Sequence, residues 1–378
     1  MPITQSEQRL RKPRVAVTLG DPAGIGPELM AKLLSNPANL EKAEVLVMAD
    51  HSELATAVSD AGNIRLPANV TVMHDGTAPS TPIPRQQVSK AGGERCLHQF
   101  HRCLDMSRRG EIDAVVFAPL NKSSLKLAGV TEEDELRWFA KQLDFKGTTS
   151  EINIAGPLWT ARVTSHVGIE KVANMVTKDA TIRAIELLHR LRYDFISDSK
   201  TALLTKYRWE SGIERPRLGV CALNPHNGEN GNFGRQEIDH IAPAVAVTRA
   251  KGIDVEGPFP CDTIFLKRSK YDGIVTMYHD QGQIAIKLLS FEGGVTVQGG
   301  LPVVITTPAH GTAFDIVGQN LASVTSTQNA FDVAVEMASR RIAAKDGGSE
   351  TAYVTSLQLN EKNAAKVETT EIVVPSCC

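Results

Sequence analysis

The sequence lacks the features that mark several large classes of protein. Its six cysteines form no CxxC pair and show no spacing typical of a secreted disulfide scaffold. Its 41 Lys and Arg residues nearly balance its 43 Asp and Glu residues, and no basic stripe or polybasic block occurs, which argues against nucleic acid and anionic membranes as partners. No long apolar run follows the basic start, so we expect neither a signal peptide nor a transmembrane span, and a cytoplasmic location.

Two common nucleotide-binding signatures are also missing. The stretch GDPAGIGPE, residues 20–28, is neither GxGxxG nor a Walker A sequence, because no Lys-Ser/Thr follows its last glycine. Its glycines could still let backbone amides face an anion at a helix start, and Pro27 suits a first helical turn. The stretch therefore predicts a junction between a loop and a helix, with an anion site as an open alternative.

Short apolar runs alternate with helical patterns through most of the 378 residues. A chain of this length can build two domains, and its 42% hydrophobic and 22% charged residues are ordinary for a globular protein. Strand-like runs are VAVTL at 15–19, EVLVMAD at 44–50, DAVVFAPL at 113–120, RLGVCALNPH at 217–226, GIVTMYHD at 273–280 and PVVITTP at 302–308. Helices are expected from about Pro27 and at 51–61, 121–128, 234–251, 281–289 and 326–344. This alternation predicts a largely parallel sheet covered on both faces.

Other segments carry less regular patterns. Cys96 and Cys103 are seven residues apart, which favours a small apolar role on one helix face. Residues 191–216 are expected to form an exposed excursion, and 346–378 a polar tail, with disorder as one option.

Four histidines follow apolar runs directly: His166, His226, His279 and His310. Since ligands of open α/β sheets bind outside the carboxyl ends of the strands, we expect these side chains at a single sheet edge. Three neutral imidazoles are a suitable ligand set for a catalytic divalent metal with an open coordination position. The separations of 60 and 53 residues match no short metal motif, and each histidine could instead cap a turn or a helix.

Two further side chains have two readings each. Lys287 lies in the apolar stretch QIAIKLLSF, where it either extends to solvent or binds an anionic substrate. Asp262, in PFPCDTIF, is either a helix cap or a carboxylate of the site.

Six motifs, in order, resemble the 4-hydroxythreonine-4-phosphate dehydrogenase family of vitamin B6 (pyridoxine) biosynthesis. They are TLGDPAGIGPE, TSHVGIEKV, LNPHNGENGNFGRQEID, GPFPCDTIF, MYHDQGQIAIK and HGTAFDIVG, and the resemblance covers most of residues 14–344. It implies an isocitrate/isopropylmalate dehydrogenase-like α/β fold in which two domains with largely parallel sheets flank a cleft. Residues 1–131 with 296–345 would form the cofactor-side domain, and 132–295 the domain for metal, substrate and dimerisation.

The resemblance also implies an activity and a set of site residues. The activity would be NAD- or NADP-dependent oxidation, with decarboxylation, of a β-hydroxy acid in a homodimer. His166, His226 and His279 match the metal ligands, with zinc favoured and Mg, Mn or Co open. Lys287 matches a substrate-binding and catalytic lysine, and Asp262 a catalytic aspartate. The NAD-binding loop would include His310, Gly311, Thr312 and Asp315.

Departures from the family pattern fall where it binds substrate. Glu135 and Leu136 stand in place of a His and a Thr that hold the phosphorylated substrate, and Thr296 and Ile305 in place of an Asn and an Arg. Losing several charge-assisted contacts, each worth roughly 1.5–3 kcal/mol, would disfavour 4-hydroxythreonine-4-phosphate as the substrate. Arg137 could bind a carboxylate instead, as expected of an enzyme similar to terephthalate cis-dihydrodiol dehydrogenase. Phosphate acyl transfer and a catalytically silent regulator are the remaining alternatives.

Overall fold

The computed structural model describes residues 11–196, 216–290 and 292–346 of the chain. Most of the predicted excursion at 191–216 and nearly all of the tail at 346–378 lie outside these residues. Within them, eleven strands form one sheet in the order β3-β2-β1-β4-β11-β10-β5-β6-β9-β7-β8. The strands are β1 (Arg14–Thr18), β2 (Glu44–Met48), β3 (Thr71–Val72), β4 (Ala114–Phe117), β5 (Ser150–Ala155), β6 (Leu158–Arg162), β7 (Leu218–Cys221), β8 (Val255–Phe259), β9 (Gly273–Thr276), β10 (Val295–Gly299) and β11 (Val304–Pro308).

The sheet consists of two parallel blocks joined by antiparallel strands. Strands β3, β2, β1, β4 and β11 pair in parallel, as do β6, β9, β7 and β8. Between the blocks, β11 with β10, β10 with β5, and β5 with β6 are antiparallel. Because three reversals separate the blocks, their carboxyl ends belong to opposite edges of the sheet. The predicted single edge is therefore wrong: His310 follows a strand of the first block, whereas His166, His226 and His279 follow strands of the second.

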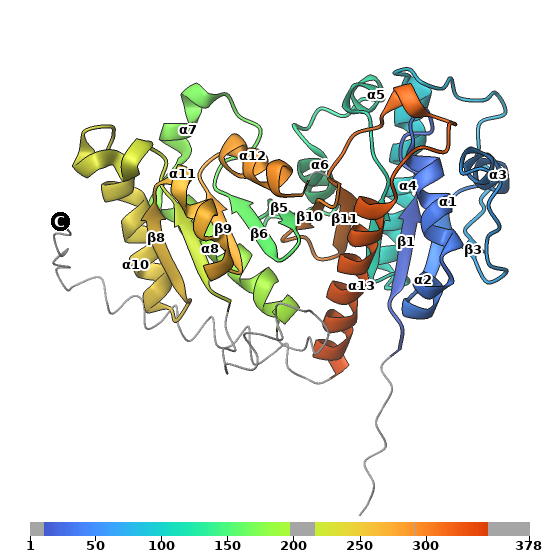
Figure 1. Ribbon diagram of the computed structural model, residues 1–378. Helices are drawn as coiled ribbons and strands as arrows, with labels where there is room; N and C mark the ends of the chain where they lie inside the picture. Colours follow the sequence, from blue (N-terminus) through green and yellow to red (C-terminus); the bar gives the residue numbers. More distant parts are fainter. Residues whose placement is uncertain (1–10, 197–215, 291, 347–378) are drawn as a thin grey trace, which may run out of the picture.

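Helices cover both faces of the sheet, and the expected α/β class is confirmed. They are α1 (Gly26–Ser35), α2 (Pro37–Lys42), α3 (His51–Asp60), α4 (Lys90–Arg108), α5 (Lys122–Leu127), α6 (Glu135–Gln142), α7 (Ile169–Met175), α8 (Lys178–Ile196), α10 (Ala242–Ala250), α11 (Cys261–Ile264), α12 (His279–Leu289) and α13 (Thr325–Asp346). The first block lies on the right of Figure 1 and the second on the left, with α12 above the strands between them. No helix in the described ranges is both long and apolar enough to span a membrane.

The hydrophobic core is continuous on one face of the sheet and divided on the other. Val17 of β1, Ile152 of β5 and Val275 of β9 belong to a single cluster beneath α1, α13, α8 and α10. On the opposite face, one cluster packs α4 and α6 on the first block, and a second packs α11 and α12 on the second block. Cys96 and Cys103 are buried on α4, as expected, and burial raises the pKa of the Cys103 thiol to about 12.

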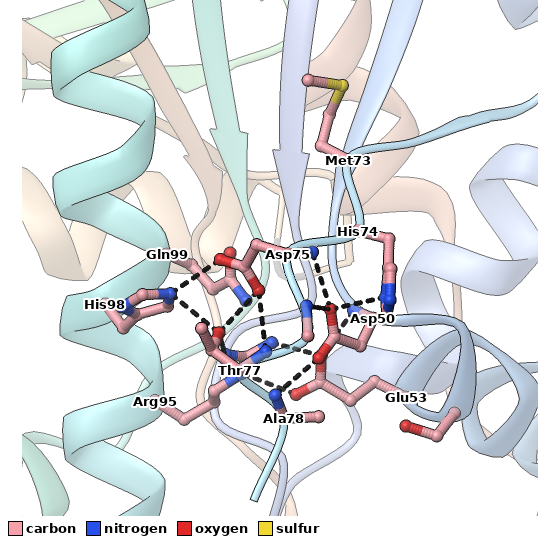
Figure 2. A network of polar contacts seen from close by, with 12 residues as sticks. Asp50, Glu53, Met73, His74, Asp75, Thr77, Ala78, Arg95, His98 and Gln99 are labelled. Carbon is pink, nitrogen blue, oxygen red and sulfur yellow. Dashed lines mark hydrogen bonds and ion pairs between the residues drawn. The ribbon is translucent and has the colours of Figure 1, made fainter.

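A polar network ties the loop after β3 to the start of α3 and to the middle of α4 (Figure 2). Asp50, at the start of α3, accepts hydrogen bonds from the backbone N–H groups of Asp75, Gly76 and Ala78. Asp75 in turn accepts from the Thr77 hydroxyl at 2.6 Å and pairs with His98 at 2.9 Å. These bonds fix a segment that has almost no strand of its own, since β3 contains only two residues.

Candidate active site

Polar side chains occupy the gap between the two separate cores. Along β5, β6 and β10, alternate residues enter the continuous core, so the residues between them point to the opposite face. Between the two hydrophobic clusters on that face, the side chains are polar. All of these polar side chains except Thr296 are buried. They are Glu151, Asn153, Thr160, Arg162, Thr296 and Gln298. Buried polar groups need partners, so this patch, which we call the polar floor, is a candidate ligand-binding surface.

His166 and His279 lie side by side at one end of the polar floor. Their ring centroids are 5.4 Å apart. Backbone bonds from Val163 N–H to the Thr276 carbonyl and from Thr164 N–H to the Met277 carbonyl extend the β6–β9 contact toward both histidines. Helix α12 begins at His279 itself, two residues before the predicted start.

Each of these two histidines has a carboxylate partner at Nδ1. His166 Nδ1 is 2.9 Å from Asp134 Oδ2, and His279 Nδ1 is 2.7 Å from Asp280 Oδ1. Because a carboxylate only accepts hydrogen bonds, each Nδ1 carries the proton and each Nε2 keeps a free lone pair. Burial, assisted by the nearby charge of Arg162, lowers the pKa of His279 and favours the neutral ring that binds metals. This donor pair fits a divalent cation.

His226 is not part of this pair in the structure. It is exposed on a segment, Pro225–Gly231, and its ring contact is with Phe233. Residues His226–Asn230 all have positive φ angles, between 44° and 74°, and only one of the five is a glycine. Glu237, which is buried, holds the start of this turn by accepting bonds from the backbone N–H groups of Leu223 and Asn224, each at 2.8 Å. Strain of this kind is commonly kept at functional sites.

Lys287 and Asp262 are both exposed. Lys287 lies on α12 one turn after Gln283, whose amide donates to Asn153 of the polar floor at 2.9 Å. Asp262 lies in the short helix α11. The structure thus keeps Lys287 on the helix that covers the floor, whereas no contact described for Asp262 joins it to the histidines.

The three other residues considered for substrate binding are Glu135, Arg137 and Thr296. Glu135, half-buried, is 4.0 Å from the Lys122 ammonium. Arg137, exposed on α6, donates to the Thr149 hydroxyl at 2.7 Å, so its guanidinium already has a partner. Thr296 accepts from Asn153 at 3.0 Å and belongs to the polar floor.

The predicted cofactor loop packs on the glycine-rich loop after β1. Ile25 N–H donates to the Thr312 carbonyl at 3.0 Å, and a Cβ at Gly24 would approach the Thr312 side chain to 2.7 Å. Thr312 is buried, His310 is half-buried, and Gly311 and Asp315 are exposed. Burial lowers the pKa of His310.

The alternative of an anion site at residues 20–28 stays a prediction. The backbone N–H groups of Asp21, Ala23, Gly24 and Ile25 all donate to acceptors within the protein. These four amides are used in folding the loop, and Gly24 also allows close packing against Thr312.

Sequence reasoning missed Asp134, Glu237 and the polar floor. Asp134 has the local pattern of a helix N-cap, but its partner His166 is 32 residues away in the chain. The floor residues alternate with apolar ones in SEINIA and LWTAR, a signal of a half-exposed strand that could have been found.

Comparison with known proteins decides the family. Residues 29–334 match the family described as pyridoxal phosphate biosynthetic protein PdxA. The chain belongs to this family. A Pseudomonas aeruginosa protein provisionally named 4-hydroxythreonine-4-phosphate dehydrogenase 2 is 46% identical over 86% of this chain and 97% of the relative. D-threonate 4-phosphate dehydrogenase of Cupriavidus necator is 34% identical over 87% of this chain and 98% of the relative.

Solved structures of similar proteins agree with this assignment. The 4-hydroxythreonine-4-phosphate dehydrogenase of Klebsiella pneumoniae matches with a TM-score of 0.72 and 31% identity, over 88% of this chain and all of that one. A terephthalate 1,2-cis-dihydrodiol dehydrogenase of Burkholderia xenovorans matches with a TM-score of 0.60 and 26% identity, over 86% of this chain and 98% of that one. Membership of a family of dehydrogenases makes this chain an oxidoreductase that acts on a CH–OH group. The alternative of acyl transfer is thereby set aside.

Proposed function

We propose that this PdxA-family protein oxidises the hydroxyl group of a phosphorylated β-hydroxy acid with NAD or NADP, followed by loss of CO2. The relatives named for 4-hydroxythreonine-4-phosphate and D-threonate 4-phosphate support the substrate class. The observation that carries the chemistry is the pair of imidazoles, 5.4 Å apart, each with its Nε2 free.

His166 and His279 would hold a divalent cation together with His226. Zinc suits neutral imidazole ligands best, although Mg, Mn or Co would fit the same role. Such a cation supplies positive charge that favours an ionised substrate hydroxyl and the negative charge that develops on decarboxylation.

We propose that His226 comes from a second copy of the chain in a homodimer. Its exposure on a strained turn, away from the other two histidines, supports this arrangement. The exposed apolar residues Ile284 and Leu288 on α12 offer a surface that a second copy can cover.

The chain's own residues would perform the remaining tasks. Lys287, on the helix above the polar floor, would bind the substrate carboxylate, and Asp262 would assist proton transfer. The loop with His310, Gly311, Thr312 and Asp315 would bind the cofactor. The two domains would be residues 1–131 with 296–345, and residues 132–295.

A carboxylated cis-dihydrodiol is a second candidate substrate. The observation in its favour is Glu135 in the first turn of α6, where the family pattern has a histidine that holds the phosphorylated substrate. Carboxylates repel a phosphate dianion but tolerate a diol, which donates hydrogen bonds to them. The structural relative named for the terephthalate diol also supports this candidate.

A substrate screen tests both candidates directly. Formation of NADH or NADPH would be followed with 4-hydroxythreonine-4-phosphate, D-threonate 4-phosphate and aromatic cis-dihydrodiol carboxylates, each with Zn or Mn. We expect turnover with a phosphorylated hydroxy acid. Turnover with the diols alone would favour the second candidate, and no turnover with any compound would contradict the proposal.

A further inference from the structure

We propose that Asp134 is a positioning residue that sets the tautomer of His166, so that Nε2 of this histidine can bind metal. The inference rests on the proposed metal site, but its geometry does not depend on a metal. The Asp134 side chain is only 1% exposed, and its Oδ2 lies 2.9 Å from His166 Nδ1. Metal-binding histidines are commonly oriented by such a carboxylate at the other ring nitrogen.

Both oxygens of the Asp134 carboxylate are in use, so the group cannot turn away. Oδ1 accepts from the backbone N–H of Arg137 at 2.8 Å, which caps the start of α6. Since both oxygens accept hydrogen bonds, the proton in the contact with His166 resides on Nδ1 of the ring.

A second possibility is that Asp134, Glu151 and His166 bind a cation among themselves. Their potential ligand atoms lie within 4.8 Å of one another. However, Glu151 pairs with the guanidinium of Arg162, a buried cation that would repel a metal at this point. Asp134 therefore holds His166 through its Nδ1 and leaves its Nε2 for the cation.

Asp280 provides a matched comparison within the same site. It makes the equivalent contact to His279 Nδ1, at 2.7 Å, but its side chain is 67% exposed against 1% for Asp134. Water competes with an exposed carboxylate, so its bond fixes a tautomer less firmly. Asp134 should accordingly matter more than Asp280.

Two substitutions separate the positioning role from the capping role. Asp134→Asn keeps a good N-cap through Oδ1, but its NH2 then faces His166 Nδ1 and donates to it, which moves the ring proton to Nε2. Asp134→Ser also caps the helix, but its hydroxyl is too short to reach the imidazole. A purely structural role predicts that both variants behave alike.

The first readout is the tautomer of His166 in metal-free protein at pH 8, measured by NMR of ¹⁵N-histidine-labelled samples. The His166 signal is identified by its loss in His166→Ala. We expect the Nδ1–H form in the unmodified protein and the Nε2–H form in Asp134→Asn. The Nε2–H form in the unmodified protein would overturn the proposal.

The second readout is zinc affinity, measured by competition with a chromophoric chelator. We expect Asp134→Asn to bind zinc roughly 10–100-fold more weakly, with smaller losses for Asp134→Ser and Asp280→Asn. Equal affinities for a folded Asp134→Asn and the unmodified protein would overturn the proposal. If the unmodified protein binds no zinc, the proposed metal site fails, while the tautomer measurement still decides the role of Asp134.

Discussion

At the candidate site, buried carboxylates hold neighbouring residues in place through the hydrogen bonds that they accept. Asp134 and Glu237 each satisfy backbone N–H groups and at the same time hold a histidine or its turn in place. Bonds of this kind link residues far apart in the chain, which is why the local pattern around Asp134 indicated a helix cap and gave no sign of His166. The histidines themselves could be selected from sequence because each directly follows a buried run.

His279→Ala should abolish metal-dependent turnover and leave the fold intact. The side chain is half-exposed at the first turn of α12, so its loss removes a ligand without opening the core. Turnover with added zinc and the thermal unfolding midpoint are the measurements. His240→Ala, a half-buried histidine of the second block, is the control and should keep its activity. Full activity of His279→Ala after exhaustive chelation would rule out the metal assignment.

Lys287→Ala should lower kcat/KM for a carboxylate substrate by about 10–100-fold, because a charge-assisted hydrogen bond is worth roughly 1.5–3 kcal/mol. Lys287→Arg should recover part of the loss. Steady-state kinetics measure the effect, and Lys345→Ala, an exposed lysine on α13, serves as the control. An unchanged kcat/KM would mean that Lys287 only extends into solvent.

Among the helices and strands, the sequence patterns best predicted the strands whose residues are nearly all buried. Strands β1, β4, β9 and β11 are buried runs followed by helices or loops, and their positions were predicted well. Strands β5 and β10 were missed because one side of each enters the core while the other faces the polar floor. Antiparallel pairing of these strands also reversed the sheet, which no local pattern reveals.

The loop anchored by Asp75 gives a prediction about pH. Burial opposes ionisation of Asp75, but bonds from Thr77 and His98 and the Arg102 charge lower its pKa below the ordinary value. A carboxyl with a lowered folded-state pKa stabilises the protein above its unfolded pKa, and this contribution is lost as the pH falls below about 4. Asp75→Asn should therefore cost about 1–3 kcal/mol at pH 7 and progressively less between pH 4 and pH 2.5.

Urea unfolding at several pH values measures this difference. Asp105→Asn is the control, since Asp105 is 56% exposed and pairs with Arg108 on the same helix. It should change the free energy of unfolding by less than about 0.5 kcal/mol. A cost for Asp75→Asn that stays constant with pH would show that its charge is not what anchors the loop.

At the scale of the whole molecule, the exposed apolar residues of α12 are the surface that we propose a second copy of the chain covers. Leu288 is 83% exposed and Ile284 is 59% exposed, one turn apart on a helix that also carries Lys287 and His279. Leu288→Glu should shift the proposed dimer toward monomer in sedimentation velocity and weaken zinc binding, because His226 would then no longer be supplied by a partner.

Leu127→Glu is the matched control, since Leu127 is 55% exposed on α5, a different helix, which lies on the side of the first block in Figure 1. It should leave the sedimentation coefficient unchanged. A monomeric unmodified protein with full zinc affinity would contradict the assignment of His226 to a second copy.

The most direct test of the account as a whole is NADH or NADPH formation from a phosphorylated β-hydroxy acid before and after removal of bound metal. We predict turnover that chelation abolishes and that added zinc or manganese restores, with CO2 released in step with the reduced cofactor. Turnover that is unaffected by complete metal removal would contradict the central claim that the two adjacent imidazoles serve a catalytic cation.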